Sequence, residues 1–183
     1  FEMEDAIVES VVYKYGTYKD RTVICCSTQS GCPVGCTFCG TGKRFVRNLT
    51  AREIVGQINY VMNEIVLKEI DSPADIKKFQ LMFMSMGEPM LNFNELSIAI
   101  KELNGMYKNA QLLLSTVGIN NDETLARLLE ISKQIDKVGL QFSIHQSNED
   151  KRNNLIPFKN KMNLRKIRDY GKSGQELLGA QCI

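Results

Sequence analysis

The sequence predicts an α/β protein whose parallel strands are covered by helices and curl toward an open or partial barrel. Apolar, β-branched segments alternate with amphipathic segments along most of the 183 residues, and this alternation is typical of parallel sheets. Right-handed crossovers curl such a sheet. The four visible strand–helix units are too few to close an eight-stranded barrel. A chain of this length is enough for one domain of ordinary size.

An N-terminal β-hairpin is expected to open the chain. Residues 6–14 and 21–27 are rich in β-branched side chains, and residues 15–20 between them are typical of a turn. The second hairpin strand is then the first strand of the barrel. A capping box at 50–53 predicts a helix that runs to about residue 69.

The remaining units repeat the order of strand and helix. We expect strands at 79–85, 110–116 and 138–145, and helices at about 94–103, from 121 or 122 onward, and at about 148–170. Asn94 and Asn104-Gly105 are expected to begin and end the first of these helices. Because parallel strands end at one edge of a sheet, we expect their polar, glycine-bearing last residues to face a common ligand.

The composition is that of an ordinary globular chain. Hydrophobic residues make up 43% and charged residues 24%, with a net charge of only +2, so overall charge gives no argument for nucleic-acid binding. No apolar stretch is long enough to cross a membrane, and no signal peptide is visible. A transmembrane helix and a disordered or fibrous chain are thus excluded.

The cysteines are concentrated near the N-terminus. Five of the six lie between residues 25 and 39, and the sixth is Cys182. A secreted disulfide framework would spread its cysteines along the chain to join distant segments. We therefore expect a metal or redox site in a protein of the reducing cytoplasm.

Cys32, Cys36 and Cys39 form a CxxxCxxC motif directly after the first barrel strand. Thiolates at this spacing can bind three irons of a [4Fe–4S] cluster and leave the fourth open for the amino and carboxylate groups of S-adenosylmethionine. Structural zinc is the alternative, and it requires a fourth ligand. The candidates for that ligand are Cys25, Cys182 and His145. The spacing favours the cluster.

Polar groups end the next three strands. Gly87-Glu88-Pro89 can place a carboxylate against the ammonium of a bound amino acid, or it can be a plain turn. Ser115 and Ser143 end the following two strands, where a lone serine is often only a cap. His145 is the only histidine, and a structural hydrogen bond is the alternative to a ligand role. Their shared edge with the cysteine loop favours a joint site.

Several short stretches follow one another in the order known from one family. They are residues 25–32, 36–39, 41–42, 47–50, 86–92, 114–119 and 142–145, followed by Asn148, Arg152, Leu155, Ile156 and Pro157. With them, the chain from about residue 7 to 170 resembles the RlmN/Cfr radical-SAM RNA methyltransferases. The resemblance implies a partial radical-SAM barrel, a [4Fe–4S] cluster, S-adenosylmethionine and an RNA substrate.

The resemblance also assigns roles to residues. The cluster would be bound by Cys32, Cys36 and Cys39. The S-adenosylmethionine site would be lined by Gly87, Glu88, Ser115, Ser143, Ile144 and His145. Glu9 matches the general base and Cys182 the cysteine that carries a methyl group. Cys25 matches the cysteine that resolves the intermediate by forming a disulfide bond with Cys182.

The implied reaction is methylation of C2, or C8, of an adenosine in ribosomal RNA, with tRNA as a second candidate. These ring carbons are electrophilic, so they cannot attack a methyl sulfonium directly. Instead, the Cys182 thiolate takes the methyl group, and a 5′-deoxyadenosyl radical activates it. Glu9 removes the ring proton from the protein–RNA covalent intermediate, and Cys25 releases the product. An electron donor such as flavodoxin or ferredoxin is implied as a partner.

The chain also departs from the family pattern. The family has a helical domain that would precede residue 1 and two further βα units. We therefore expect the full barrel to be interrupted after about residue 171, with about a hundred residues missing. We expect residues 1–183 to form one radical-SAM core. Its parts are the hairpin and first strand at 1–27, the cluster loop at 28–49, the βα units at 50–171 and the cysteine tail at 172–183.

Two other functions stay open. One is a radical-SAM enzyme with a changed substrate, and the other is a non-enzymatic, metal-stabilised RNA-binding module. Two basic segments can bind phosphates or can be ordinary solvated surface. The first comprises Lys43, Arg44, Arg47 and Arg52, and the second comprises Lys151, Arg152, Lys159, Lys161, Arg165, Lys166, Arg168 and Lys172.

Overall fold

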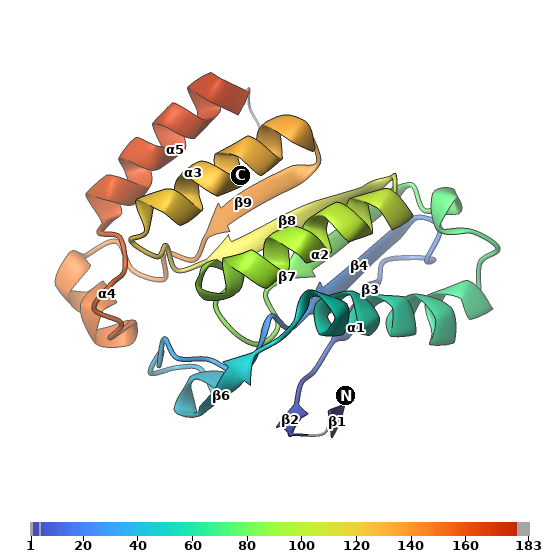
Figure 1. The fold of residues 1–183 in the computed structure, drawn as a ribbon, viewed down its shortest axis with the longest axis horizontal. Coiled ribbons are helices and arrows are strands. Elements are labelled where there is room, and N and C mark those ends of the chain that lie inside the picture. Colours follow the sequence, from blue (N-terminus) through green and yellow to red (C-terminus); the bar gives the residue numbers. More distant parts are fainter. Residues whose placement is uncertain (1, 4, 179–183) are drawn as a thin grey trace.

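A five-stranded sheet forms the centre of the computed structural model, which describes residues 2, 3 and 5–178. The strands are β3 (Val11–Lys14), β4 (Arg21–Cys26), β7 (Lys78–Phe83), β8 (Ala110–Thr116) and β9 (Val138–Phe142), in the order β3-β4-β7-β8-β9. β3 is antiparallel to β4, and the other neighbours are parallel (Figure 1). The predicted α/β class is confirmed, and barrel curvature stays a prediction.

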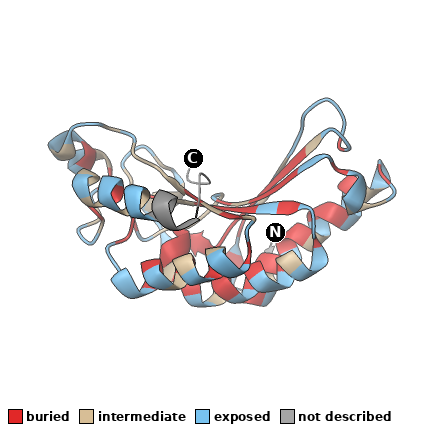
Figure 2. Ribbon diagram, turned by 90° about the horizontal axis from the view of Figure 1, so that it is seen from above, coloured by how far each residue is buried: buried red, intermediate tan, exposed pale blue. Residues whose placement is uncertain are grey.

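Five helices accompany the sheet. They are α1 (Ala51–Glu64), α2 (Phe93–Met106), α3 (Asp122–Gln134), α4 (Glu149–Leu155) and α5 (Leu164–Leu178). Figure 2 shows helices layered against one face of the sheet. The core lies between that layer and the strands. The residues that belong to this core alternate along β4, β7, β8 and β9, as with Leu81 and Phe83 of β7. Within the described residues, no helix is both long and apolar enough to cross a bilayer.

Two small antiparallel sheets, which the sequence did not predict, flank the central one. One joins β1 (Glu2–Met3) to β2 (Ala6–Ile7), and the other joins β5 (Gln29–Gly31) to β6 (Phe45–Asn48). The first comes before β3 in the chain, and the two strands of the second lie on either side of the cysteine loop. The predicted hairpin strand at 6–14 is therefore split, because its first residues pair with the N-terminus and only its last four pair with β4.

The capping box of α1 is confirmed, since Thr50 and Glu53 exchange side-chain and backbone hydrogen bonds. The boundaries predicted for the next helix are wrong at both ends. The helix begins after Asn92, and Asn94 instead accepts a hydrogen bond from Arg127 at 2.6 Å.

The same helix continues through Asn104-Gly105 to Met106. Tertiary packing overrides the local preference for termination there. The Tyr107 amide donates to Leu103, its ring packs edge-on against Phe79, and its hydroxyl donates to Asn59.

The C-terminal region also differs from expectation. β9 ends at Phe142 rather than 145, and the helical segment expected at 148–170 is two helices, α4 and α5. Residues 156–163 connect them, and Lys161 forms a bridge to Ile119. This connection brings α4 beside the end of β8, close to the edge where the predicted site residues lie.

Candidate functional site

The carboxyl ends of β7, β8 and β9 surround one cavity together with the cysteine loop. Its volume is about 180 Å³. Cys32, Cys36 and Cys39 line one part of it, and the strand ends contribute Gly87, Glu88, Ser115, Ser143 and His145. The convergence expected from parallel strands is thus observed for eight predicted residues.

Three backbone hydrogen bonds support the cysteine loop, one of them within the loop and two to other segments. The Cys32 amide donates to the carbonyl of Arg44 at 3.0 Å, next to the β5–β6 pair. The Cys39 amide donates to Cys36 at 3.1 Å, which closes a local turn. The Thr37 amide donates to the carbonyl of Leu155, at the end of α4, at 2.9 Å. The loop therefore depends on groups both near and far in sequence.

The thiols of Cys32, Cys36 and Cys39 are ligands of the kind that bind an iron–sulfur cluster. Burial raises the pKa of Cys32 to about 11, and the nearby charges of Glu88, Cys36 and Cys39 add to that effect. Burial also raises the pKa of Cys36. A bound metal reverses such shifts because it stabilises thiolates. The described residues contain no group of three metal-binding side chains already close enough to hold a single ion, so the three thiols share a cavity without forming a closed metal site.

Glu88 is the most constrained polar residue of the cavity. Its carboxylate accepts hydrogen bonds from the Thr116 hydroxyl at 2.5 Å, the Val117 amide at 2.9 Å and the Met90 amide at 3.0 Å. It is 3% exposed, and burial raises its pKa to about 7 against the opposing effect of these donors. Oε2 accepts only one of the three bonds, which leaves it an acceptor position for a further donor.

The other strand ends meet directly. The hydroxyl oxygens of Ser115 and Ser143 are 3.2 Å apart, which joins the ends of β8 and β9. His145 has a backbone φ of 60°, in the left-handed region that few non-glycine residues adopt. Its ring lies 4.6 Å, between centroids, from Phe38 of the cysteine loop. The predicted residue Ile144 is half-buried and does not line the cavity.

Cys25 and Glu9, two of the three predicted catalytic residues, lie elsewhere. Cys25 is buried on β4 opposite Val11, and burial raises its thiol pKa. Glu9 is exposed, and its carbonyl accepts a hydrogen bond from Ser27 at 2.7 Å. Neither lines the cavity of the cysteines, although both lie near the same end of β4. Cys182 lies outside the described residues.

The disulfide expectation is not supported by the structure. The five described cysteines, residues 25, 26, 32, 36 and 39, all have free thiols. Cys25 therefore has no disulfide partner within the described part of the chain.

Comparison with known proteins identifies the fold family. The model of the radical SAM superfamily matches residues 26–176. The chain belongs to this superfamily. Membership implies a [4Fe–4S] cluster and S-adenosylmethionine, and the matched residues include the cysteine loop and the three strand ends.

Individual relatives confirm the RlmN/Cfr resemblance within the radical SAM superfamily. The chain is 35% identical over 179 residues to a probable dual-specificity RNA methyltransferase RlmN of Fervidobacterium nodosum, covering 95% of this chain and 47% of the relative. It is 36% identical over 182 residues to the Pseudothermotoga lettingae counterpart, covering 96% and 48%. The dual-specificity RNA methyltransferase RlmN of Halorhodospira halophila is 34% identical over 152 residues, covering 80% and 38%. The chain thus spans about half the length of the first of these relatives.

Two side chains that sequence reasoning missed support this radical-SAM cavity. Gln29 accepts from the Glu88 amide at 2.8 Å and donates to Asn48 of β6 at 2.7 Å. Gly87 has a φ of 100°, and a Cβ there would lie 2.6 Å from the Gln29 side chain. In the sequence, only Gly87 indicated this close contact, because its partner Gln29 is far away in the chain.

Arg152 is the second missed residue, and it corrects one expectation. It was included in a basic segment for phosphates, but it is fully buried. Its guanidinium donates to the carbonyls of Val117 at 2.7 Å and Met162 at 2.8 Å. Arg152 therefore fixes the loop after β8 instead of presenting charge to solvent.

Proposed function

We propose that this chain is the core of an S-adenosylmethionine-dependent radical RNA methyltransferase. The observation that carries the proposal is the single cavity that combines the CxxxCxxC cysteines with the ends of β7, β8 and β9. Family membership and the RlmN relatives support it. We extend the proposal to a single radical-SAM core over residues 1–183, acting in the cytoplasm.

The cysteines Cys32, Cys36 and Cys39 would bind the cluster. When bound, the cluster supplies the electron that cleaves S-adenosylmethionine to a 5′-deoxyadenosyl radical. The protein's part is to orient that molecule. The free acceptor position of Glu88 suits an ammonium group, and a nearby positive charge favours the ionised carboxylate.

The remaining contacts would come from the strand ends. Ser115 and Ser143 can donate to a carboxylate or a ribose hydroxyl. Gly87 and His145 would contribute backbone groups and a surface for the adenine ring, with Ile144 beside His145 but outside the cavity lining. With these contacts, the cluster and S-adenosylmethionine would lie on neighbouring walls of one cavity.

The methyl transfer would also use Cys182, Glu9 and Cys25, of which Glu9 and Cys25 do not line this cavity. The Cys182 thiolate would attack the methyl carbon of one S-adenosylmethionine, forming a C–S bond and releasing S-adenosylhomocysteine. After the 5′-deoxyadenosyl radical has taken a hydrogen atom and the methylene carbon has bonded to the adenine ring, the adduct would return one electron to the redox partner and Glu9 would take the ring proton. The Cys25 thiolate would then attack the Cys182 sulfur, forming an S–S bond and breaking the S–CH2 bond, and the released carbon would take a proton to become the methyl group of the product.

The substrate is proposed from the relatives' names and from this chemistry. It is an adenosine of ribosomal RNA, methylated at C2 or alternatively C8, with tRNA as a second substrate. A flavodoxin or ferredoxin would supply electrons to the cluster. The described residues contain no membrane-spanning helix, and the proposal requires no membrane.

Anaerobic reconstitution tests the proposal at its first step. The protein should bind about four irons and four sulfides, and Cys32→Ala, Cys36→Ala and Cys39→Ala should each abolish the cluster. Addition of S-adenosylmethionine should change the electron paramagnetic resonance spectrum of the reduced cluster. Stoichiometric zinc without acid-labile sulfide would instead indicate the non-enzymatic metal-stabilised module.

Incubation with RNA tests the substrate. Mass spectrometry of digested RNA should detect methyladenosine when S-adenosylmethionine and a reductant are present. A chain that cleaves S-adenosylmethionine reductively but methylates no RNA would be a radical-SAM enzyme with a changed substrate.

A further inference from the structure

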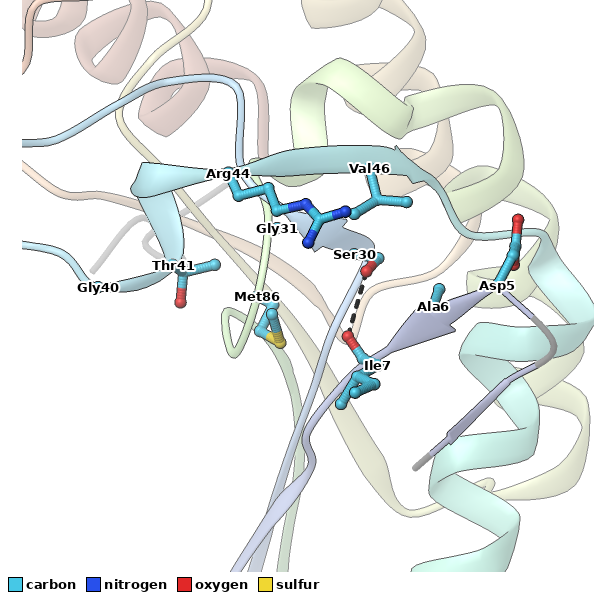
Figure 3. A pocket seen from close by; sticks show the side chains of 10 residues that line it. All are labelled: Asp5, Ala6, Ile7, Ser30, Gly31, Gly40, Thr41, Arg44, Val46 and Met86. Carbon is cyan, nitrogen blue, oxygen red and sulfur yellow. Dashed lines mark hydrogen bonds between the residues drawn. The ribbon is translucent and has the colours of Figure 1, made fainter.

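A second and larger cavity lies beside the first. Its volume is about 430 Å³, and it is bounded by the N-terminal residues 5–7, by β5 and β6, by the turn at 40–41 and by Met86. Figure 3 shows Thr41 at one end and Asp5 at the other. None of the residues predicted to bind the cluster or S-adenosylmethionine, or to act in catalysis, lines it, but Arg44 of the first basic segment does.

The β-bulge of the β5–β6 pair builds this cavity. The register shifts between Ser30 and Gly31, and a bulge of this kind redirects the side chains of the opposing strand. Gly31 has a φ of 74°, and a Cβ there would lie 1.9 Å from the carbonyl oxygen of Arg44. The glycine thus allows the two backbones to meet, and the Arg44 side chain extends along β6 toward Val46 with its guanidinium over Ser30 and Gly31 (Figure 3).

The opposite wall is held in place by an ion-pair network. Arg47 donates to both carboxylate oxygens of Asp5, at 2.7 to 3.0 Å, and to Glu53 at 2.8 and 2.9 Å. The Ser30 hydroxyl donates to the carbonyl of Ile7 at 3.1 Å. These bonds attach the N-terminal segment to β5 and β6, and they neutralise Asp5, the one carboxylate among the described lining residues.

Within the described residues, Arg44 has no counter-ion. None of them forms a hydrogen bond or ion pair with its side chain, whereas Arg47, three positions later, has two acidic partners. Arg44 is exposed to solvent. A free guanidinium that faces a cavity is suited to an anion with several oxygens, such as a phosphate.

The remaining lining is apolar and continues toward the first cavity. Ala6, Ile7, Val46 and Met86 supply hydrocarbon surface, and Ile7 is 70% exposed. Thr41 lines both cavities, and Met86 directly precedes Gly87 of the first one. A ligand in the second cavity would therefore lie next to the cysteine loop. A guanidinium beside apolar walls suits a nucleotide, whose phosphate is charged and whose sugar and base have apolar faces.

We infer that the second cavity is a docking subsite for one nucleotide of the RNA substrate, with Arg44 paired to its phosphate. The inference rests on the proposed function. It places the flanking nucleotide on the β5–β6 side of the cysteine loop.

The test measures binding of a fluorescein-labelled RNA stem-loop to the full chain by anisotropy, over a series of salt concentrations. Arg44→Ala should weaken binding about tenfold or more at low salt. It should also reduce the slope of log K against log salt by about 0.7 to 1, because one phosphate contact is lost. Iron content should stay unchanged, since the Cys32 amide bonds to the backbone of residue 44.

Lys101→Ala is the matched control. It removes the same unit charge from an exposed position on α2, outside this cavity, and should change affinity less than about twofold. Val46→Asp places a carboxylate in the cavity and should weaken RNA binding as Arg44→Ala does. Adenosine monophosphate should compete with the RNA more effectively than inorganic phosphate, because only the former also fills the apolar walls.

Each contrary outcome has a distinct meaning. RNA binding that is indifferent to Arg44, or equally sensitive to Lys101, would overturn the subsite and leave the proposed function intact. Equal competition by inorganic phosphate would indicate a free-anion site and would also overturn it. If Arg44→Ala abolished reduction of the cluster by flavodoxin and left RNA affinity unchanged, the surface would be a docking site for a protein and not for RNA. Absence of RNA binding by the unaltered chain would defeat the proposed function itself.

Discussion

Glu88 illustrates how one side chain can serve both architecture and chemistry. Its carboxylate joins the loop after β7 to the end of β8 through Thr116 and Val117. Truncation to alanine would leave these donors buried without an acceptor, which costs about 1–3 kcal/mol for each. A Glu88→Ala variant therefore cannot separate ligand binding from folding, and serine variants are more informative.

Ser143→Ala should weaken S-adenosylmethionine binding by about 2- to 10-fold, the effect of one neutral hydrogen bond. The hydroxyl faces the cavity and Ser115, and its loss leaves the backbone unchanged. Isothermal calorimetry on the anaerobic, cluster-loaded protein measures the affinity.

Ser147→Ala is the control for this serine, because Ser147 is exposed and does not line the cavity. It should bind as the unaltered protein does. Equal affinities for all three proteins, with equal iron contents, would remove Ser143 from the co-substrate site.

Cys25→Ala and Cys182→Ala should fail in different ways. Without Cys182 no S-methylcysteine and no RNA product should form, because the methyl acceptor is absent. Without Cys25 the methyl group should still transfer, but the protein–RNA adduct should accumulate, since no thiol releases it by exchange. Denaturing gels followed by nuclease digestion and peptide mass analysis distinguish the two.

Cys26→Ala is the appropriate comparison for Cys25. Cys26 is fully buried in the core on the other face of β4, so its loss should lower stability without trapping RNA. An active Cys25→Ala enzyme without any adduct would leave Cys25 as a core residue only.

At the scale of elements, the short β5–β6 pair has a disproportionate effect on the site. Arg44, which directly precedes β6, supplies the carbonyl that accepts from the Cys32 amide, and the bulge of the pair positions Arg44. Sequence reasoning missed this pair because its strands are only three and four residues long, and their polar residues lack a hydrophobic alternation.

Gly31→Ala should therefore disrupt both cavities. The new Cβ would meet a backbone carbonyl in a left-handed conformation, so the loss of stability should be roughly 2 kcal/mol or more. Cluster content after reconstitution should fall with it, because Cys32 is the next residue. Chemical denaturation and iron analysis measure the two effects.

The same glycine-to-alanine substitution at Gly56 should have the opposite effect on stability. Gly56 lies within α1 with no atom near its virtual Cβ, so alanine should stabilise the protein by up to about 1 kcal/mol. A Gly31→Ala protein as stable as the unaltered chain would show that the bulge does not require glycine.

The longer helices and strands could be predicted where the local sequence pattern determines their bounds. The strand at 110–116 and the capping box at 50–53 are confirmed. The end of α2 was not predictable, because the contacts of Tyr107 with Phe79 and Asn59 carry the helix past Gly105. Tertiary packing of this kind has no counterpart in a local window.

At the scale of the whole molecule, one part of the candidate site could be predicted from the sequence and another part could not. Cysteine spacing and the shared edge of parallel strands predicted which residues line the first cavity. They could not predict Gln29 or Arg152, because each acts through partners far away in sequence. They also gave no indication of the second cavity, which depends on a bulge and on a network joining residue 5 to residues 47 and 53.

Stability should depend on pH through Glu88. Its pKa in the folded chain, about 7, lies above the ordinary value of 4.5. The folded state therefore binds more protons between these values, and the free energy of unfolding should fall as pH rises from about 4.5 to 7, by up to roughly 3 kcal/mol. Urea unfolding of the metal-free chain across this range measures the change.

Glu88→Gln isolates the contribution of this carboxyl. It keeps the shape of the side chain and removes the titration, so its stability should fall less steeply over the same pH interval. Parallel pH profiles of the two proteins would show that Glu88 titrates near its ordinary pKa.

The support given by Leu155 to the cysteine loop has a consequence for the order in which the protein matures. Thr37 and Leu155 are 118 residues apart, so during synthesis the loop leaves the ribosome well before the helix that fixes it. Until α4 has formed and Arg152 has anchored it, the thiols are attached to an unsupported segment. Iron and sulfide should consequently be inserted after translation into an already folded chain, and nascent chains ending before α4 should be poor acceptors for them.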